Sequence, residues 1–370
     1  MIRILHVLHS MDRGGAENAL MNYYRHIDRT ELQFDFLLTT SQKSQFEEEI
    51  LEMGGIIYHI PVMTKRNPFR YLFALDNFFK KHKEYEIVHS HTSSKSVFPL
   101  YFAKKHGIKV RIAHSHNTKS ESGLNGVIRD FLKKPLIKVA NYYFACGNEA
   151  GRWLYGNKLF ESGKVKVVPN VIDSKLFLFN REIRHKMREK LNVPEDTIIV
   201  GCTARFSKQK NHCFLLDVFA AFRETFHNSK LLLIGDGELK NSIIEKSQRL
   251  NVFNDIIFTG VVPNVADYEQ AMDLFLMTSL YEGLPLSVVE AQISGLPCIV
   301  GESVTKEVDL TGLVSFLPIN HEIDMWVKEM NEQLGKVRTG YLPSIIKAGY
   351  DAETSAKDLQ SFYLSSLKLK

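Results

Sequence analysis

The amino-acid sequence predicts an α/β protein with two parallel sheets, one in each half of the chain. Short apolar runs alternate with segments of helical spacing, a pattern typical of parallel strands that helices cover on both faces. The chain has 370 residues, of which 44% are hydrophobic, too many for one ordinary domain and enough for two cores. Both halves open in the same way, with a strand, a polar loop and a helix.

The first unit begins with the strand RILHVLHS, the Gly-rich turn MDRGGAE and the helical segment NALMNYYRHI. Further strands are predicted at FDFLLTT, IIYHIPV, YEIVHSH, VRIAHSH and YYFACGN, with helical patterns such as SQFEEEILEMG and FRYLFALDNFFKKH between them. The segment KVKVVPNVIDSKLF, residues 164–177, predicts a last strand followed by a Pro/Asn turn.

The second unit follows a charged, strand-poor stretch, residues 181–196. It opens as TIIVGCTARFSKQKNHCFLLDVFAAF, and the strands LLLIGDG, IIFTG, LFLMTS and LPCIVG come after it. Open parallel sheets bind ligands at the carboxyl ends of their strands. Two such edges facing each other would form a cleft between the domains, the usual place for a substrate.

Composition excludes some classes of function. The net charge of +5 and the pI of about 8.8 suit an anionic substrate or membrane surface, and are too weakly basic to indicate nucleic acid. Four scattered cysteines without a C-x-x-C, and an N-terminus unlike a secretory signal, favour reduced thiols in a cytoplasmic protein. No stretch approaches the ~18 apolar residues of a membrane span.

Two glutamates stand eight positions apart in SLYEGLPLSVVEAQISGLP, residues 279–297. Glu282 follows a predicted strand, in a turn that glycine and proline keep from forming a helix. A helix beginning at Ser287 would let Ser287 and Glu290 form a capping box, the purely structural interpretation. The functional alternative is that free N–H groups at this helix start bind an anion while both carboxylates accept hydrogen bonds from sugar hydroxyls.

A basic cluster, ARFSKQKN at residues 204–211, lies between a predicted strand and a helix. Arg205 and Lys210 would stand at the carboxyl end of that strand and could neutralise a diphosphate, arginine as a planar fork and lysine as a point charge. A solvated basic loop is the alternative, and we expect it for Lys208.

Two H-x-H pairs end two predicted strands, His89 with His91 and His114 with His116. Alternation puts both members of a pair on one face, which allows a zinc site geometrically, although the chain offers no supporting carboxylate or cysteine spacing. Hydrogen bonding or proton handling at a polar cleft is the favoured interpretation. Ordinary core or surface histidines are the alternative for His89 and His114.

Two Gly-rich stretches follow predicted strands. Gly14 and Gly15 open a helix and could approach a ligand closely, because glycine has no Cβ. The GDG stretch at residues 235–237 is nearer to a dinucleotide fingerprint, but Lys240 stands in place of the last glycine. The sequence has no Asp-x-Asp pair for Mg²⁺ or Mn²⁺, so we expect no metal and no cofactor.

Together these motifs resemble the retaining glycosyltransferases of family 4, which have two Rossmann-like domains (the GT-B fold), and in particular their bacterial capsular and exopolysaccharide branch. The resemblance covers the whole chain. ILHVLHSMDRGGAENALMNYYR is similar to that branch's opening, residues 282–290 match the E-x7-E motif, ARFSKQKN stands at the Arg…Lys phosphate clamp, and VVPNVID resembles the P-N-G-[VI]-D linker. The ordered set is specific, whereas any single member is not.

The resemblance implies a metal-independent, retaining hexosyltransferase of surface polysaccharide biosynthesis. The donor would be a nucleotide-diphosphate sugar, expected to be a UDP-sugar, and the acceptor a saccharide or a lipid-linked saccharide. Residues 1–172 would form the acceptor domain, onto which a last helix at about 352–370 crosses back, and residues 173–351 the donor domain.

The resemblance also implies roles for single residues. Arg205 and Lys210 would hold the diphosphate, Glu290 the ribose hydroxyls, and Glu282 the donor sugar, by positioning rather than attack. His116 would lie near the sugar C6, with His114 as its rival; Arg205, Lys210, Glu282 and His116 form the expected catalytic set. The remaining expected donor contacts are Gly14, Gly15, Gly283, Leu284, Pro285, Leu286 and Ser287.

The sequence departs from the family's motifs at two places, and three alternative functions stay open. Val171 stands where many members have glycine, and Leu284-Pro285 replaces a frequent Phe-Gly, which leaves the local loop shapes open. A nucleotide-sugar epimerase of the same fold and a non-catalytic sugar-nucleotide binder stay open as functions. An NAD-dependent oxidoreductase would want G-x-G-x-x-G and an acidic ribose ligand, and neither appears cleanly.

Membrane contact is a separate hypothesis. RNPFRYLFALDNFFKKHK and GLNGVIRDFLKKPLIK are basic and amphipathic, and the first has Asn67 as a predicted N-cap with Pro68 as the first helical residue. Both could rest on the anionic inner membrane, peripherally on its cytoplasmic face. Ordinary core helices explain the same pattern.

Overall fold

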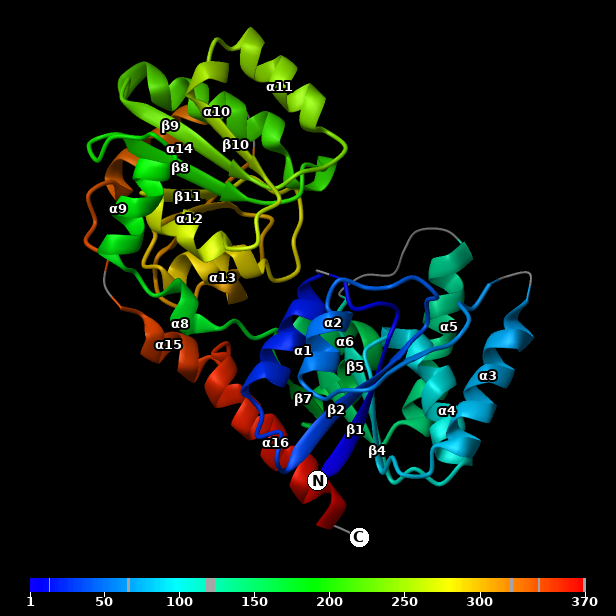
Figure 1. Cartoon of the computed structure of the whole chain (residues 1–370). Coiled ribbons are helices and arrows are strands. Elements are labelled where there is room, and N and C mark those ends of the chain that lie inside the picture. The colour runs from blue at the N-terminus through cyan, green and yellow to red at the C-terminus, as the bar shows by residue number, and fades with distance from the viewer. Residues whose placement is uncertain (13, 65–66, 118–123, 320–321, 339, 369–370) are drawn as a thin grey trace. The chain divides into compact units, whose positions relative to one another are not determined.

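The computed structural model describes residues 1–12, 14–64, 67–117, 124–319, 322–338 and 340–368. The chain divides into two compact units: unit 1 is Met1–Ile172 with Gly349–Lys370, and unit 2 is Asp173–Ala348. Parts of four predicted features lie outside the described residues, namely Arg13 of the Gly-rich turn, Arg66 of the first amphipathic segment, residues 118–123, and residues 369–370 of the last helix. Each unit is a parallel sheet covered by helices (Figure 1), which confirms the predicted α/β class.

Unit 1 contains a seven-stranded parallel sheet in the order β3-β2-β1-β4-β5-β6-β7. Its strands are β1 (Ile2–Leu8), β2 (Leu32–Leu38), β3 (Ile57–His59), β4 (Ile87–Ser90), β5 (Val110–Ser115), β6 (Tyr142–Ala145) and β7 (Val165–Val167). Both faces of β1 are buried, with Ile4 and Leu8 in one core and Leu5 and Val7 in the other. Burial on both faces is why these strands read as continuous apolar runs.

The helices of unit 1 come from both ends of the chain. They are α1 (Gly15–His26), α2 (Glu47–Glu52), α3 (Pro68–Lys81), α4 (Val97–Lys105), α5 (Leu124–Val139), α6 (Asn148–Tyr155), α7 (Asn157–Glu161) and α16 (Ala352–Lys368). The last of these, α16, lies along α1 and buries Leu359 and Tyr363 in the core that contains Ile4 (Figure 1). Just before α16 begins, a β-bridge between Ile172 and Asp351 joins the two stretches of chain that make up unit 1.

Unit 2 contains a six-stranded parallel sheet in the order β10-β9-β8-β11-β12-β13. Its strands are β8 (Ile198–Thr203), β9 (Ser229–Ile234), β10 (Ile256–Gly260), β11 (Leu274–Met277), β12 (Cys298–Gly301) and β13 (Val314–Leu317). Its helices are α8 (Ser174–Phe177), α9 (Arg181–Lys190), α10 (His212–Thr225), α11 (Lys240–Arg249), α12 (Val265–Ala271), α13 (Leu286–Ile293), α14 (Ile323–Gln333) and α15 (Leu342–Lys347).

In each sheet, the strands that come next in the chain lie on one side of the first strand, and the later strands lie on its other side. The order therefore reverses between β1 and β4 in unit 1 and between β8 and β11 in unit 2. In open α/β sheets, ligands bind at the carboxyl ends of the two strands that flank such a reversal. The fold thus marks one candidate site in each unit.

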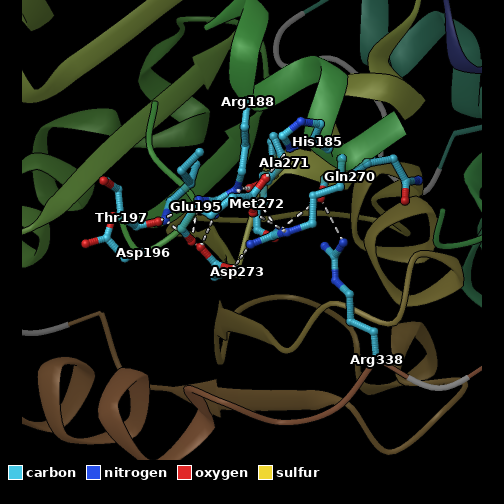
Figure 2. A network of polar contacts seen from close by, with 12 residues as sticks. His185, Arg188, Glu195, Asp196, Thr197, Gln270, Ala271, Met272, Asp273 and Arg338 are labelled. Atoms are coloured by element: carbon cyan, nitrogen blue, oxygen red, sulfur yellow. Dashed lines mark hydrogen bonds and ion pairs between the residues drawn. The ribbon is translucent and has the colours of Figure 1, made fainter. Parts of the chain in front are cut away.

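A buried polar network fixes the opposite, amino ends of β8 and β11 (Figure 2). Asp273, just before β11, lies 2.7 Å from the guanidinium groups of both Arg184 and Arg188, and it accepts a hydrogen bond of 2.7 Å from the Ile199 N–H of β8. The Arg188 side chain is 1% exposed and also donates to the carbonyl oxygens of Pro194, Thr197 and others. This network ties α9 to the two strands that flank the reversal.

The N-terminus of α3 matches its prediction. The Asn67 side chain accepts a hydrogen bond of 3.1 Å from the Arg70 N–H, and Pro68 is the first helical residue. None of the helices that the structure describes is long and apolar enough to cross a membrane.

Replacing Asp273 by asparagine should destabilise unit 2 by about 3 kcal/mol, because it leaves the buried Arg188 charge without its carboxylate. The chain has two tryptophans, Trp153 in unit 1 and Trp326 in unit 2. Denaturant unfolding followed by Trp326 fluorescence in a Trp153→Phe background therefore reports unit 2 alone. Glu332→Gln, which breaks the exposed Lys328–Glu332 pair of the same unit, is the matched control and should change little. Equal effects of the two substitutions would contradict the role given to Asp273.

Candidate functional site

The loops after β8 and β11 lie against each other at the carboxyl edge of the unit 2 sheet. The Leu280 N–H donates to the Gln209 carbonyl at 2.8 Å, and the Gln209 side chain donates to the Tyr281 carbonyl at 2.9 Å. Lys210 Nζ lies 2.6 Å from Glu282 Oε1, and these side chains are 20% and 9% exposed. The structure thus brings two of the predicted site residues together as an ion pair.

Arg205 is on the same loop but is not part of that pair. Its side chain is 74% exposed and lies 3.2 Å from the Glu238 carboxylate. Lys208 is exposed, as expected for a solvated position. Of the two cations predicted to bind a diphosphate, Lys210 is held in place and Arg205 extends into solvent.

The GDG stretch supports this loop by close packing. A Cβ on Gly235 would lie 2.1 Å from the Ala204 carbonyl oxygen, and one on Gly237 would lie 2.5 Å from that of Phe206. Gly235 also has a φ of +139°, a conformation that side chains disfavour. Both glycines therefore let the loop after β9 pack against the loop after β8. This packing accounts for them without a dinucleotide, so the oxidoreductase alternative is not favoured.

The capping box, the purely structural interpretation of Ser287 and Glu290, does not form. Helix α13 begins one residue earlier, at Leu286, so Ser287 is inside the helix, and the N-cap residue is Pro285 with no side-chain cap. Proline fixes φ near the helical value, and Pro285 has a φ of −75°, so the chain can enter the helix directly after it. The first N–H groups of a helix have no intrahelical partners. Here no side chain of the N-cap residue covers them.

Glu290 faces a second carboxyl group that the sequence does not predict. Glu269, on α12, is completely buried, and the Thr203 hydroxyl beside it lowers the pKa of its carboxyl group by less than burial raises it. Burial raises the pKa of Glu290 to about 7. Burial, and then the nearby Glu290 charge, raise the pKa of Glu269 well above its usual range. The pair therefore resists carrying two negative charges.

Arg338 lies next to this pair. It donates hydrogen bonds of 3.0 Å to the backbone carbonyls of Glu269 and Gln270, and its charge lowers the pKa of Glu269 by less than burial raises it. Burial lowers the pKa of Arg338 to about 9. Neither Glu269 nor Arg338 stands out in the sequence, because YEQAMD reads as an ordinary helix and Arg338 is far away in the chain.

Five histidines gather at the corresponding edge of the unit 1 sheet. His6 of β1 pairs in register with His89 of β4, and the side chains of His6, His89 and His114 alternate onto the face that α1 and α16 cover. His91 and His116 follow the ends of β4 and β5 on the same face. The predicted pairs thus share one face, and His6 joins them. Alternation in ILHVLHS was the signal that could have identified His6.

Two chains of hydrogen bonds connect these rings. In the first, Tyr363 Oη lies 2.6 Å from His89 Nδ1, and His89 Nε2 lies 3.1 Å from His114 Nδ1. In the second, His6 Nδ1 lies 3.0 Å from His91 Nε2, and His91 Nδ1 lies 2.9 Å from His116 Nε2. Burial lowers the pKa of His6 to about 3 and that of His116 to about 4, so the cluster is neutral at pH 7.

The two predicted rivals for sugar contact differ in access. His114 is 3% exposed inside β5 and is bonded to His89, whereas His116 follows the strand and is only partly buried. His116 is therefore the one better placed to reach a bound molecule.

The Gly-rich turn is occupied by the chain's own carboxylate. Gly14 caps α1, and a Cβ there would lie 2.3 Å from a carboxylate oxygen of Glu17. Gly14 therefore makes room for Glu17. Beyond it lies a cavity of about 330 Å³, lined among others by Glu17, His91, Lys95, Arg129 and Trp153.

Comparison with known proteins gives consistent matches. A family model described as glycosyl transferases group 1 matches residues 183–310, and one described as glycosyltransferase family 4 matches residues 13–176. The chain is 36% identical to EpsF of Bacillus subtilis (strain 168), whose name is "Putative glycosyltransferase EpsF", over 98% of this chain and 96% of that protein. It is 26% identical to the capsular polysaccharide biosynthesis glycosyltransferase CapH of Staphylococcus aureus, over 99% of each. Anabaena HepE, solved in complex with UDP, shares the fold with a TM-score of 0.78 and 18% identity, over 99% of this chain and 100% of that one.

The Glu269–Glu290 pair predicts how the stability of unit 2 depends on pH. Both pKa values are raised in the folded protein, so it binds more protons than the unfolded chain between about pH 4.5 and 7, and stability falls as pH rises through that window. Glu269→Gln removes one ionisation. The free energy of unfolding of the Glu269→Gln variant should therefore equal that of wild type at about pH 5 and exceed it by about 1–3 kcal/mol at pH 8. Trp326 fluorescence in the Trp153→Phe background measures it, and a gain that does not change with pH would rule the interpretation out.

Proposed function

The chain belongs to the group 1 glycosyltransferases of family 4, and on that premise we propose that it is a metal-independent, retaining enzyme of surface polysaccharide biosynthesis. It moves a hexose from a nucleotide-diphosphate sugar, a UDP-sugar in our proposal, to a saccharide or lipid-linked acceptor. UDP is proposed because HepE, which shares the fold, was solved with it.

The observation that carries this proposal is the ion pair of Lys210 and Glu282 at the carboxyl edge of the unit 2 sheet. A cation and an acid at this edge match the two parts of a nucleotide sugar, the diphosphate and the hydroxyl-rich sugar. Each group neutralises the other until the donor arrives. The donor phosphates then replace Glu282 as the partner of Lys210, and the sugar hydroxyls donate to Glu282.

The chemistry follows from where charge develops. Breaking the bond between sugar and phosphate builds negative charge on the leaving diphosphate, and contacts that strengthen with that charge lower the barrier. Lys210, Arg205 and the uncapped amides at the start of α13 supply such contacts without a metal. The acceptor attacks on the face that the diphosphate leaves, and Glu282 positions the sugar.

Glu290 and His116 complete the donor contacts. Glu290 accepts hydrogen bonds from the ribose hydroxyls, and its proximity to Glu269 makes this contact depend on pH. His116 hydrogen-bonds to the sugar, and the backbone of Gly14 and Gly15 contacts the donor at the start of α1, where Glu17 fills the space beside Gly14. Gly283, Leu284, Pro285, Leu286 and Ser287 contribute backbone contacts.

Unit 1 holds the acceptor in this proposal. The cavity of about 330 Å³ has two cations, Lys95 and Arg129, together with Trp153 and Phe98. Cations suit a phosphate of a lipid-linked acceptor, and aromatic rings suit the apolar faces of sugars. This composition supports an acceptor that carries both.

A peripheral location on the cytoplasmic face of the inner membrane is the second part of the proposal. Helix α3 exposes Phe69 and Phe73, and α5 exposes Val127, Ile128 and Phe131, while α4 packs against both helices. Packing in the core does not explain why these five apolar side chains are exposed. The basic residues Lys80, Lys81 and Lys134 on the same helices add attraction to anionic lipids.

Substitutions in unit 2 test the donor site. A thermal-shift screen against UDP, GDP, ADP and their sugars, in EDTA, first selects the donor. Glu290→Ala should then weaken nucleotide affinity about tenfold through lost hydrogen bonds. Arg205→Ala should lower the single-turnover rate about 10–100-fold and donor affinity much less, because it acts on the leaving charge. Lys208→Ala, on the same loop, is the control. Equal losses of rate and affinity in Arg205→Ala would contradict the proposed role, as would a rate that EDTA abolishes.

The membrane proposal predicts vesicle binding through exposed phenylalanines. Changing Phe69, Phe73 and Phe131 together to serine should weaken flotation with anionic vesicles at least about tenfold, because each ring loses apolar burial in the lipid interface. Val261→Ser, which changes an exposed apolar residue of unit 2, is the matched control and should float as wild type does. Unchanged flotation of the triple variant would reject the proposal.

A further inference from the structure

We propose that His91, His114 and His116 form a binding site for a borderline divalent cation such as Zn²⁺, and that occupation of this site inhibits the enzyme. The inhibition rests on the proposed function, whereas the binding does not. No step of the sugar transfer uses this ion.

The three side chains have suitable spacing. Each offers one ring nitrogen, and the three nitrogens lie within 4.8 Å of one another. Tetrahedral Zn²⁺ with Zn–N bonds of about 2.1 Å separates its ligand nitrogens by about 3.4 Å, so small ring rotations suffice. His91 Nδ1 and His116 Nε2 are already 2.9 Å apart.

The hydrogen-bond chains provide the outer shell that such a site needs. A histidine that binds a metal through one nitrogen donates the N–H of its other nitrogen to a neighbouring acceptor. His114 Nε2 makes no hydrogen bond of regular geometry among the described residues, although the Val168 backbone lies close to the ring, while its Nδ1 faces His89, which in turn faces Tyr363. His114 can therefore bind through Nε2 with its Nδ1–H donated to His89, whose own Nδ1–H is donated to Tyr363.

The second chain orients His91 in the same way. His91 Nε2 faces His6 Nδ1 at 3.0 Å, so its N–H can be donated to His6 while Nδ1 binds the ion. His6 then carries its proton on Nε2, which has no other partner among the described residues. His6, His89 and Tyr363 thus offer an acceptor for the N–H that each of two ligands must donate when it binds an ion, which distinguishes this cluster from histidines that merely lie close together.

Space and access also fit. A small cavity of about 10 Å³ is lined by His91, His114 and His116, enough for one water or ion and too small for an organic ligand. His91 also lines the cavity of about 330 Å³, which provides a route from solvent, and the Glu17 carboxylate on that cavity offsets part of the positive charge. Three imidazoles leave a fourth position for water, as in other three-histidine zinc sites.

Inhibition follows from the shared ligand. The nitrogen of His116 that binds the ion cannot also contact the donor sugar. Zn²⁺ should therefore lower transferase activity at least about tenfold, and a chelator should restore it.

Cobalt binding tests the site directly, on tag-free full-length protein treated first with chelator. Titration with Co²⁺ alone should give the visible absorption of a tetrahedral ion with a stoichiometry of one, which Zn²⁺ abolishes by displacement. His116→Gln should remove that absorption, and His6→Phe should weaken Co²⁺ affinity about 10–100-fold by removing an outer-shell partner. His227→Gln, which removes an exposed histidine of unit 2, should behave as wild type. Circular dichroism checks that each variant is folded.

Two results would overturn the proposal: wild-type protein that shows no tetrahedral Co²⁺ absorption, or His116→Gln protein that binds Co²⁺ as wild type does. Tetrahedral binding of Co²⁺ without any loss of activity in Zn²⁺ would refute the inhibition alone. Failure to find a sugar donor would count against the proposed function and would leave the binding result intact.

Discussion

Lys210 and Glu282 can form an ion pair because of the strand order of the unit 2 sheet. Strand β11 is added beside β8 on the side opposite to β9, so two loops far apart in the sequence end at the same edge. At the other end of the same two strands, Asp273 bridges Arg188 and the first residues of β8. The strands are thus fixed at both ends, and the position of one cation relative to one acid is defined by the fold before any ligand binds.

The two units have the same strand order and different chemistry at the edge where that order reverses. In unit 2 this edge carries an ion pair of Lys210 with Glu282. In unit 1 it carries neutral imidazoles joined through hydrogen bonds. A charged edge suits a diphosphate that leaves with additional negative charge. A neutral edge suits hydroxyl groups, which it can contact as either donor or acceptor.

The sequence predicted the fold class because every strand is short, apolar and followed by a helical segment. It also indicated that Lys210 and Glu282 lie at one edge of a sheet, because each is in the loop after a strand, while the roles of both residues in binding remain predictions. The helix expected from Ser287 begins one residue earlier, at Leu286, because Pro285 already has a helical φ, and so the capping box considered as an alternative does not form. Glu269, Arg338 and Tyr363 could not be found from the sequence, because their importance comes from neighbours that only the folded chain brings to them. The roles of Glu290 and His116 remain predictions.

Helix α16 also has a consequence for how the protein is made. Its residues Leu359 and Tyr363 complete the core of the first unit, yet they are synthesised after the whole of the second unit. The second unit lies wholly upstream of them, so it can fold while the ribosome is still working. The part of the first unit that precedes the second in the chain must wait for α16 with that face of its sheet only partly covered by α1, and loss of α16 would damage the first unit rather than the second one.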